Sequence, residues 1–270
     1  DAAGLAYPTD DWTWNQFLDS ARVLTQDHDG DGRIDQYGVG LAPNLFRLAP
    51  FIWQNGGELV NDYESPSRLT IDSPEARQAF QWFVNLQLVE HVVPDAREES
   101  AESSESRFLS GRLGMYFNSR RGVPAYRTIT DFQWDVAPLP RNLKPAGILH
   151  SDAYCLSAAA KNKEAAWRFI EFANSQTGQE IIAKSGRTVP SLISVAQSTA
   201  FLSPDLPPAN SRIYLDTVPH IRTVPIMPSW VGIEEQVGVE IEKSFYGEIS
   251  IDQAVENAIQ VAQPFFDPNR

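Results

Sequence analysis

The sequence contains few of the residues on which several classes of protein depend. Its 270 residues include a single cysteine, two methionines and four histidines. One cysteine cannot form a disulfide within the chain, and the histidines lack the spacing of a zinc protease. Cys155 lies in an apolar run, which predicts a buried thiol. Two methionines are too few for a calcium sensor that exposes a methionine-rich groove.

Basic residues and long apolar runs are also scarce. The chain has 22 Lys and Arg against 35 Asp and Glu, a net charge of -13, which argues against nucleic acid as a partner. No apolar run is long enough to span a bilayer. There is no Gly-rich phosphate loop and no Gly-x-Ser-x-Gly elbow, so we expect no enzyme. The length and the 42% hydrophobic content predict one large or two modest domains.

The best-defined stretch begins with a capped helix. Thr13 and Gln16 form a Thr-x-x-Gln capping box, so the helix is expected to begin at Trp14. Apolar residues follow at three- and four-residue steps, which predicts one buried face. They are Trp14, Phe17, Leu18, Ala21 and Leu24.

An acidic loop follows this helix and resembles the start of a calcium-binding loop. Counting from Asp27, carboxylates occupy positions 1, 3, 5 and 9, and position 7 supplies a backbone carbonyl in such loops. The residues concerned are Asp27, Asp29, Asp31, Arg33 and Asp35. Position 12, which is a bidentate Glu in an EF-hand, is Gly38 here. Two interpretations stay open: a structural Ca²⁺ site, or a turn held by side-chain to backbone hydrogen bonds.

The remaining sequence alternates between helical and extended patterns, which predicts an α/β fold. Further helices are expected after Pro43 and up to Gly56, from Ser73-Pro74 to Val89, at 163–174 and 177–185, and in two final segments starting near Trp230 and Ser250. Short strands are expected at 37–41, 69–71, 113–117, 134–137 and 153–158. Residues 97–106 are expected to form a solvated helix or loop, and 203–208 a linker.

Several segments, in order along nearly the whole chain, resemble one known family. They are Trp-Thr-Trp-x-x-Phe, Asp-x-Asp-Gly-Asp-Gly-x-Ile-Asp-x-Tyr-Gly, Trp53 to Gly57, Phe108 to Met115, Val136 to Pro140, Lys161 to Trp167 and Gly186 to Pro190. This ordered set is similar to the sugar-binding extracellular solute-binding proteins of ABC transporters, which include maltose-binding protein. The resemblance implies a periplasmic binding protein of type II, located in the periplasm or outside the cell and tethered to the membrane.

The resemblance also implies how the chain is divided. Residues 1–152 and 205–270 would form the second, C-terminal lobe, and 153–204 would be a helical segment returning to the first lobe, whose N-terminal part is absent. We expect the apolar stripes of 153–204 to be covered by that missing part or by another copy, because monomers rarely expose large apolar patches.

Ligand contacts follow from the positions that match the family's motifs. Aromatic rings and planar polar groups suit sugars, which offer C–H faces and hydroxyls. Two arginines stand where relatives carry a tryptophan, which hints at an anionic solute. Burial in the core is the alternative for both tryptophans in the set. The nominated residues are Phe46, Trp53, Arg120, Arg121, Asp152, Tyr154, Arg187 and Trp230.

The function implied is capture of a sugar or oligosaccharide between two lobes and its delivery to a membrane permease. A two-lobed binder closes because ligand favours the closed form. The alternative from another class is a carbohydrate-active enzyme or a calcium-stabilised carbohydrate-binding module.

Overall fold

The computed structural model describes residues 1–149 and 151–267, and these fall into two compact units. Unit 1 is assembled from residues 1–117, 139–149 and 220–267, and unit 2 from 118–138 and 151–219. The chain therefore leaves unit 1 twice and returns twice, so neither unit is continuous in sequence.

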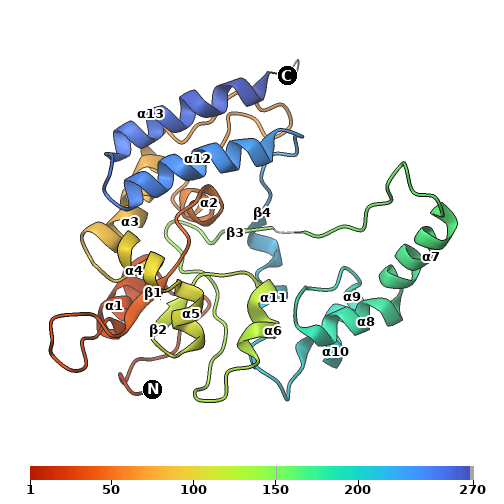
Figure 1. Ribbon diagram of the computed structural model, residues 1–270, viewed down its shortest axis with the longest axis horizontal. Coiled ribbons are helices and arrows are strands. Elements are labelled where there is room, and N and C mark those ends of the chain that lie inside the picture. Colours follow the sequence, from red (N-terminus) through yellow and green to blue (C-terminus); the bar gives the residue numbers. More distant parts are fainter. Residues whose placement is uncertain (150, 268–270) are drawn as a thin grey trace. The chain divides into compact units, whose positions relative to one another are not determined.

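Unit 1 is a mixture of helices with two small parallel sheets (Figure 1). Its elements are α1 Trp14–Leu24, β1 Tyr37–Gly40, α2 Leu45–Gln54, α3 Pro74–Leu88, α4 Ala96–Ala101, α5 Ser104–Leu109, β2 Leu113–Tyr116, β3 Gly147–Ile148, β4 Ile221–Arg222, α12 Trp230–Phe245, α13 Ile251–Ala262 and the 3₁₀ turn η3 Gln263–Phe266. A further 3₁₀ turn, η2 Val218–His220, leads into β4.

The first sheet pairs β1 with β2, and helix α1 packs closely on it. Tyr37 lies opposite Leu113 and Val39 opposite Met115 in a parallel register. A Cβ added to Gly38 would lie 2.1 Å from the carbonyl oxygen of Ala21 in α1. The sequence Tyr-Gly-Val-Gly therefore places glycine where the helix backbone approaches the strand, a contact that no side chain would permit.

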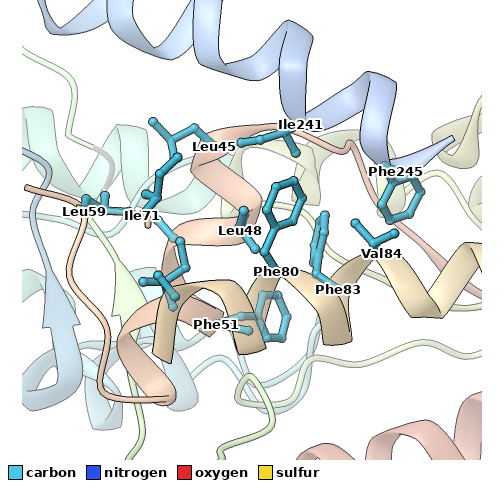
Figure 2. Packing of buried hydrophobic residues seen from close by; sticks show 14 of the residues in the cluster. Leu45, Leu48, Phe51, Leu59, Ile71, Phe80, Phe83, Val84, Ile241 and Phe245 are labelled. Atoms are coloured by element: carbon cyan, nitrogen blue, oxygen red, sulfur yellow. The ribbon is translucent and has the colours of Figure 1, made fainter. Parts of the chain in front are cut away.

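The core of unit 1 lies between α2, α3 and α12, whose apolar faces meet in Figure 2. The ring of Phe83 in α3 packs 5.7 Å from that of Phe51 in α2 and 5.3 Å from that of Phe245 in α12. All three side chains are buried, and each contributes about 1.5–3 kcal/mol relative to an exposed position. Helices α12 and α13 lie side by side and complete one wall of this core (Figure 1).

A fully buried glutamine ties three segments of this core together. Gln54, at the end of α2, accepts a hydrogen bond from Trp14 Nε1 at 2.7 Å through Oε1 and donates one to the Ala146 carbonyl at 2.9 Å through Nε2. Its backbone carbonyl also accepts from the amides of Leu143 and Lys144. A buried amide is tolerated only when it is paired, and here the pairs hold segment 139–149 against α1 and α2.

Unit 2 is smaller and largely helical. Its elements are η1 Arg120–Gly122, α6 Val123–Tyr126, α7 Lys163–Asn174, α8 Gln176–Ser185, α9 Ile193–Ala196, α10 Thr199–Leu202 and α11 Ile213–Asp216. A second apolar cluster is centred on Ala183, Val195 and Phe201. By contrast, Ala173 is the one fully buried residue of α7, which exposes about half of Trp167 and Phe172.

Segment 118–138 belongs to unit 2 because its side chains bind there. Arg127 donates to the carbonyls of Pro207 at 2.8 Å and Lys184 at 3.2 Å, and Asp135 accepts from the backbone N–H of Asn210 at 2.9 Å. The units thus divide the chain differently from the predicted boundaries at 152/153 and 204/205, since 118–138 and 205–219 cluster with 151–204.

The helices agree with prediction more closely than the strands do. The Thr13 capping box is present, Ser73 caps α3 with Pro74 at its first position, and Gly186 ends α8 in a left-handed conformation. The strands predicted at 134–137 and 153–158 are wrong, because both segments are irregular. Residues 69–71 make only an isolated bridge, between Leu69 and Val60.

Two further expectations can be compared with the structure. Cys155 is exposed, so the prediction of a buried thiol is wrong. Its apolar run lies in the irregular segment 153–158, which packs against no strand in the part of the chain that is described. None of the described helices combines the length and the apolar character needed to cross a membrane.

Candidate functional site

A hollow of about 400 Å³ opens beside the carboxyl end of strand β1. The loop after β1 and the first turn of α2 form one wall, and α12 forms the other. The lining residues are Ala42, Pro43, Asn44, Leu45, Phe46, Glu234, Glu235, Gly238, Val239 and Glu242. Ligands of α/β proteins are commonly bound outside the carboxyl ends of parallel strands, and unit 1 places its hollow there.

Local chemistry shapes both walls of this hollow. Asn44 is the N-cap of α2, and its side chain accepts from the backbone N–H of Arg47 at 3.0 Å, which fixes the turn that carries Phe46. Across the hollow, Gly238 gives α12 a flat surface: a Cβ built there would lie 3.8 Å from Cβ of Asn44. The hollow therefore combines an aromatic wall with open space beside a helix.

Carboxylates supply the polar groups of the hollow. Glu234 is half-buried, and its Oε1 accepts a hydrogen bond from Trp230 Nε1 at 2.6 Å. Burial raises the pKa of Glu234, and the bond from Trp230 opposes this rise. Glu235 and Glu242 are exposed. This set of acceptors suits hydroxyl donors.

The predicted aromatic contacts have three different environments. Phe46 lines the hollow. Trp230 is only 4% exposed, so its ring packs in the core and its N–H orients Glu234. Trp53 is 0% exposed, and this burial favours the core alternative for both tryptophans.

Three further side chains contact Trp53 or one another in a cluster that the sequence did not predict. Trp53 Nε1 donates to the Tyr63 hydroxyl at 2.9 Å. The guanidinium of Arg222 lies over both rings, 4.9 Å from that of Trp53 and 5.2 Å from that of Tyr63. Glu58 accepts two hydrogen bonds from Arg222. The residues come from distant parts of the chain, and only the fold reveals their proximity.

The nominated polar contacts all lie in unit 2. Arg120 is 6% exposed, and its guanidinium stacks 4.2 Å from the Phe201 ring and 4.8 Å from the Tyr214 ring. Burial lowers the pKa of Arg120. Of the arginine pair, only Arg121 is therefore exposed. The other three, Asp152, Tyr154 and Arg187, are exposed in irregular segments.

The acidic loop brings three of its carboxylates together. One oxygen from each of Asp27, Asp29 and Asp35 lies within 4.8 Å of the others. Asp27 accepts backbone N–H bonds from Gly30 at 2.7 Å and Gly32 at 2.9 Å, and these bonds lower its pKa.

Of the other predicted carboxylates, Asp31 does not join this group. The Asp31 carboxylate lies outside it and accepts from the backbone N–H of Arg33 at 2.8 Å. The loop thus has both the converging oxygens of the metal interpretation and the bonds of the turn interpretation. Calcium binding stays a prediction.

Several known structures share this fold. An ABC substrate-binding protein of Listeria monocytogenes in complex with cycloalternan matches 98% of this chain with a TM-score of 0.85 and 23% identity. A solute-binding protein of Thermotoga lettingae bound with α-D-tagatose matches 98% with a TM-score of 0.82 and 21% identity. The maltose/maltodextrin-binding domain of Bdellovibrio bacteriovorus bound to maltotriose matches 96% with a TM-score of 0.78 and 20% identity.

The match covers only part of each of these proteins. The chain spans 66% of the Listeria protein and 67% of each of the other two, or about two thirds of their length. A search of curated protein sequences finds no significant match. The family described as bacterial extracellular solute-binding protein matches residues 1–180. Since this match covers more than half of the sequence, the chain belongs to the bacterial extracellular solute-binding protein family.

Proposed function

We propose that this chain is the larger part of an ABC-transporter binding protein that captures a saccharide and delivers it to a membrane permease. The family match over residues 1–180 is the observation that carries the proposal. It is supported by the three similar structures, each of which holds a sugar or oligosaccharide. Binding, rather than turnover, is the activity that the family description names.

The hollow in unit 1 has the chemistry that a sugar requires. Phe46 offers an aromatic surface to the C–H face of a pyranose ring, and the carboxylate of Glu234 accepts hydroxyl hydrogen bonds. Trp230 holds that carboxylate in place, so less side-chain entropy is lost when a solute binds. We propose this hollow as the contribution of unit 1 to the sugar site.

The exposed aromatic residues of α7 support the predicted assignment of 153–204 to a first lobe. Trp167, Phe169 and Phe172 each expose more than half of their surface, which is unusual for aromatic residues so close together. We propose that these exposed residues are covered by the third of the relatives' length that this chain does not span. The test is mixing with the separately produced first lobe of a relative, followed by light scattering.

The family description implies work outside the cytoplasm, and we propose a periplasmic or extracellular location with a membrane tether in the complete protein. The two adjacent arginines were the reason to expect an anionic solute. Because Arg120 packs between two rings, that expectation now depends on Arg121 alone.

Saccharide binding can be measured directly on this chain. Maltotriose, tagatose and a uronate are titrated into ¹⁵N-labelled protein, and amide shifts around Phe46 and Glu234 are followed. Phe46→Ala is expected to weaken binding, whereas Phe108→Ala in α5, outside the hollow, is the matched control. Recovery of intact sugar supports a binder, and hydrolysis would instead support the enzyme alternative. Absence of any shift near the hollow would contradict the proposed site.

A further inference from the structure

Two of the four points at which the chain passes between the units lie beside very short strands, the joining strands. β3 and β4 have two residues each and pair in parallel, with Gly147 opposite Ile221 and Ile148 opposite Arg222. The amide of Leu149 extends the ladder by donating to the Arg222 carbonyl at 2.9 Å. A ladder this short has little stability of its own. Whether it stays formed therefore depends on the contacts that its side chains make with the rest of unit 1.

The side chain of Arg222 makes such contacts. Its Nη1 and Nη2 donate to the two oxygens of Glu58 at 2.9 and 2.6 Å, a two-pronged charged pair. The same guanidinium stacks on Trp53 and Tyr63. Planar stacking together with a paired carboxylate fixes both the position and the orientation of the group.

The partners of Arg222 are themselves fixed to the core of unit 1. Trp53 is fully buried in α2. The backbone carbonyl of Glu58 accepts from the Thr70 hydroxyl at 2.9 Å. The hydroxyl of Tyr63 receives the indole N–H of Trp53. Arg222 is thus bound to a fully buried ring and to a partly exposed carboxylate whose backbone is held in unit 1.

We propose that Arg222 and Glu58 form an anchor that clamps both joining strands to unit 1. The clamp acts on β4 through the backbone of Arg222 and on β3 through the bond to Leu149. Residues Gly147–Leu149 and Ile221–Arg222 are then held as part of unit 1. The inference goes beyond the proposed function, since it holds whatever solute the protein binds. Both residues are positioning residues.

Amide hydrogen exchange on the 270-residue chain tests the anchor. Glu58→Gln removes the charge of the acceptor and one of its two oxygens. Arg222→Lys keeps the charge but loses the planar pair and the stacking. The control is Asp252→Asn, which breaks an exposed ion pair with Arg77 elsewhere in unit 1. Exchange at Leu149 is expected to accelerate about tenfold or more in both anchor variants and to stay unchanged in the control.

The pattern of exchange distinguishes an anchor from a merely stabilising pair. The anchor predicts faster exchange at Leu149 with unchanged exchange at core amides such as that of Phe83. Unchanged exchange at Leu149 would overturn the proposal, and so would a uniform rise across unit 1. Should Glu58→Gln fail to fold, the same comparison is made with Arg222→Lys. Saccharide binding does not enter this readout, so a failure here leaves the proposed function untouched.

Discussion

Of two glycines in helix α12, only one should stabilise the protein when it is replaced by alanine. A Gly in a helix interior costs about 0.8–1.0 kcal/mol relative to Ala. At Gly238 the added methyl would meet only Cβ of Asn44, at an ordinary 3.8 Å. Gly238→Ala is therefore expected to stabilise unit 1 by about 1 kcal/mol.

At Gly232 the same methyl collides with an aromatic ring. The added Cβ would lie 2.4 Å from Cε1 of Phe265, so the ring must move. Overpacking of this kind costs about 1–3 kcal/mol, which cancels or exceeds the gain in helix propensity. Gly232→Ala is expected to be neutral or to destabilise by up to about 2 kcal/mol, and Phe265→Leu in the same chain should relieve the loss.

Urea unfolding followed by tryptophan fluorescence measures both effects. Five of the seven tryptophans lie in unit 1, and Trp134 and Trp167 are the two in unit 2. The signal therefore reports mainly on the unit that contains α12. If Gly232→Ala stabilises as much as Gly238→Ala, the ring of Phe265 is not held as described, and the packing argument fails.

Three further predictions concern the acidic loop and two buried polar groups. Millimolar calcium should raise the melting temperature and Asp27→Asn should abolish the effect, whereas identical curves in calcium and chelator would exclude a metal site. Gln54→Met should lower the unfolding free energy by about 2–5 kcal/mol, because two buried partners lose their hydrogen bonds. Exposed Gln81→Met is the control, and a loss below about 1 kcal/mol for Gln54→Met would contradict the expectation. Burial opposes the charge of Glu240, but its bonds to Lys243 and Asn257 prevail and lower its pKa. The stability it adds should be present above about pH 4.3 and disappear as the pH falls through its folded pKa. The unfolding free energies of the protein and of Glu240→Gln should then converge in acid, and a constant difference would refute the assignment.

Helix ends were predictable because their signals are local. Thr13 and Gln16 satisfy each other's backbone donors within four residues. At the start of α3, the Ser73 side chain accepts from the backbone N–H of Ala76, and Pro74 has no N–H that needs a partner. The strand predicted at 134–137 failed because a strand needs a partner, and the sequence does not say which segments will meet.

The candidate site was only partly predictable for a related reason. A tryptophan that matches a family motif can face solvent or the core, and Trp230 turns its ring inward while its N–H orients Glu234. The four-residue spacing of that pair was a usable signal. No local pattern joins Glu58 to Arg222, which are 164 residues apart.

Because unit 1 is discontinuous in sequence, its core can be completed only late in synthesis. Phe245 and the rest of the α12–α13 wall complete a core whose other members, such as Phe83, were synthesised more than 150 residues earlier. Until that wall leaves the ribosome, α2 and α3 expose their apolar faces. Pairing β3 with β4 also closes a loop of about 70 residues, at an entropic cost of about 4 kcal/mol. The nascent chain is therefore aggregation-prone until α12 and α13 have been synthesised.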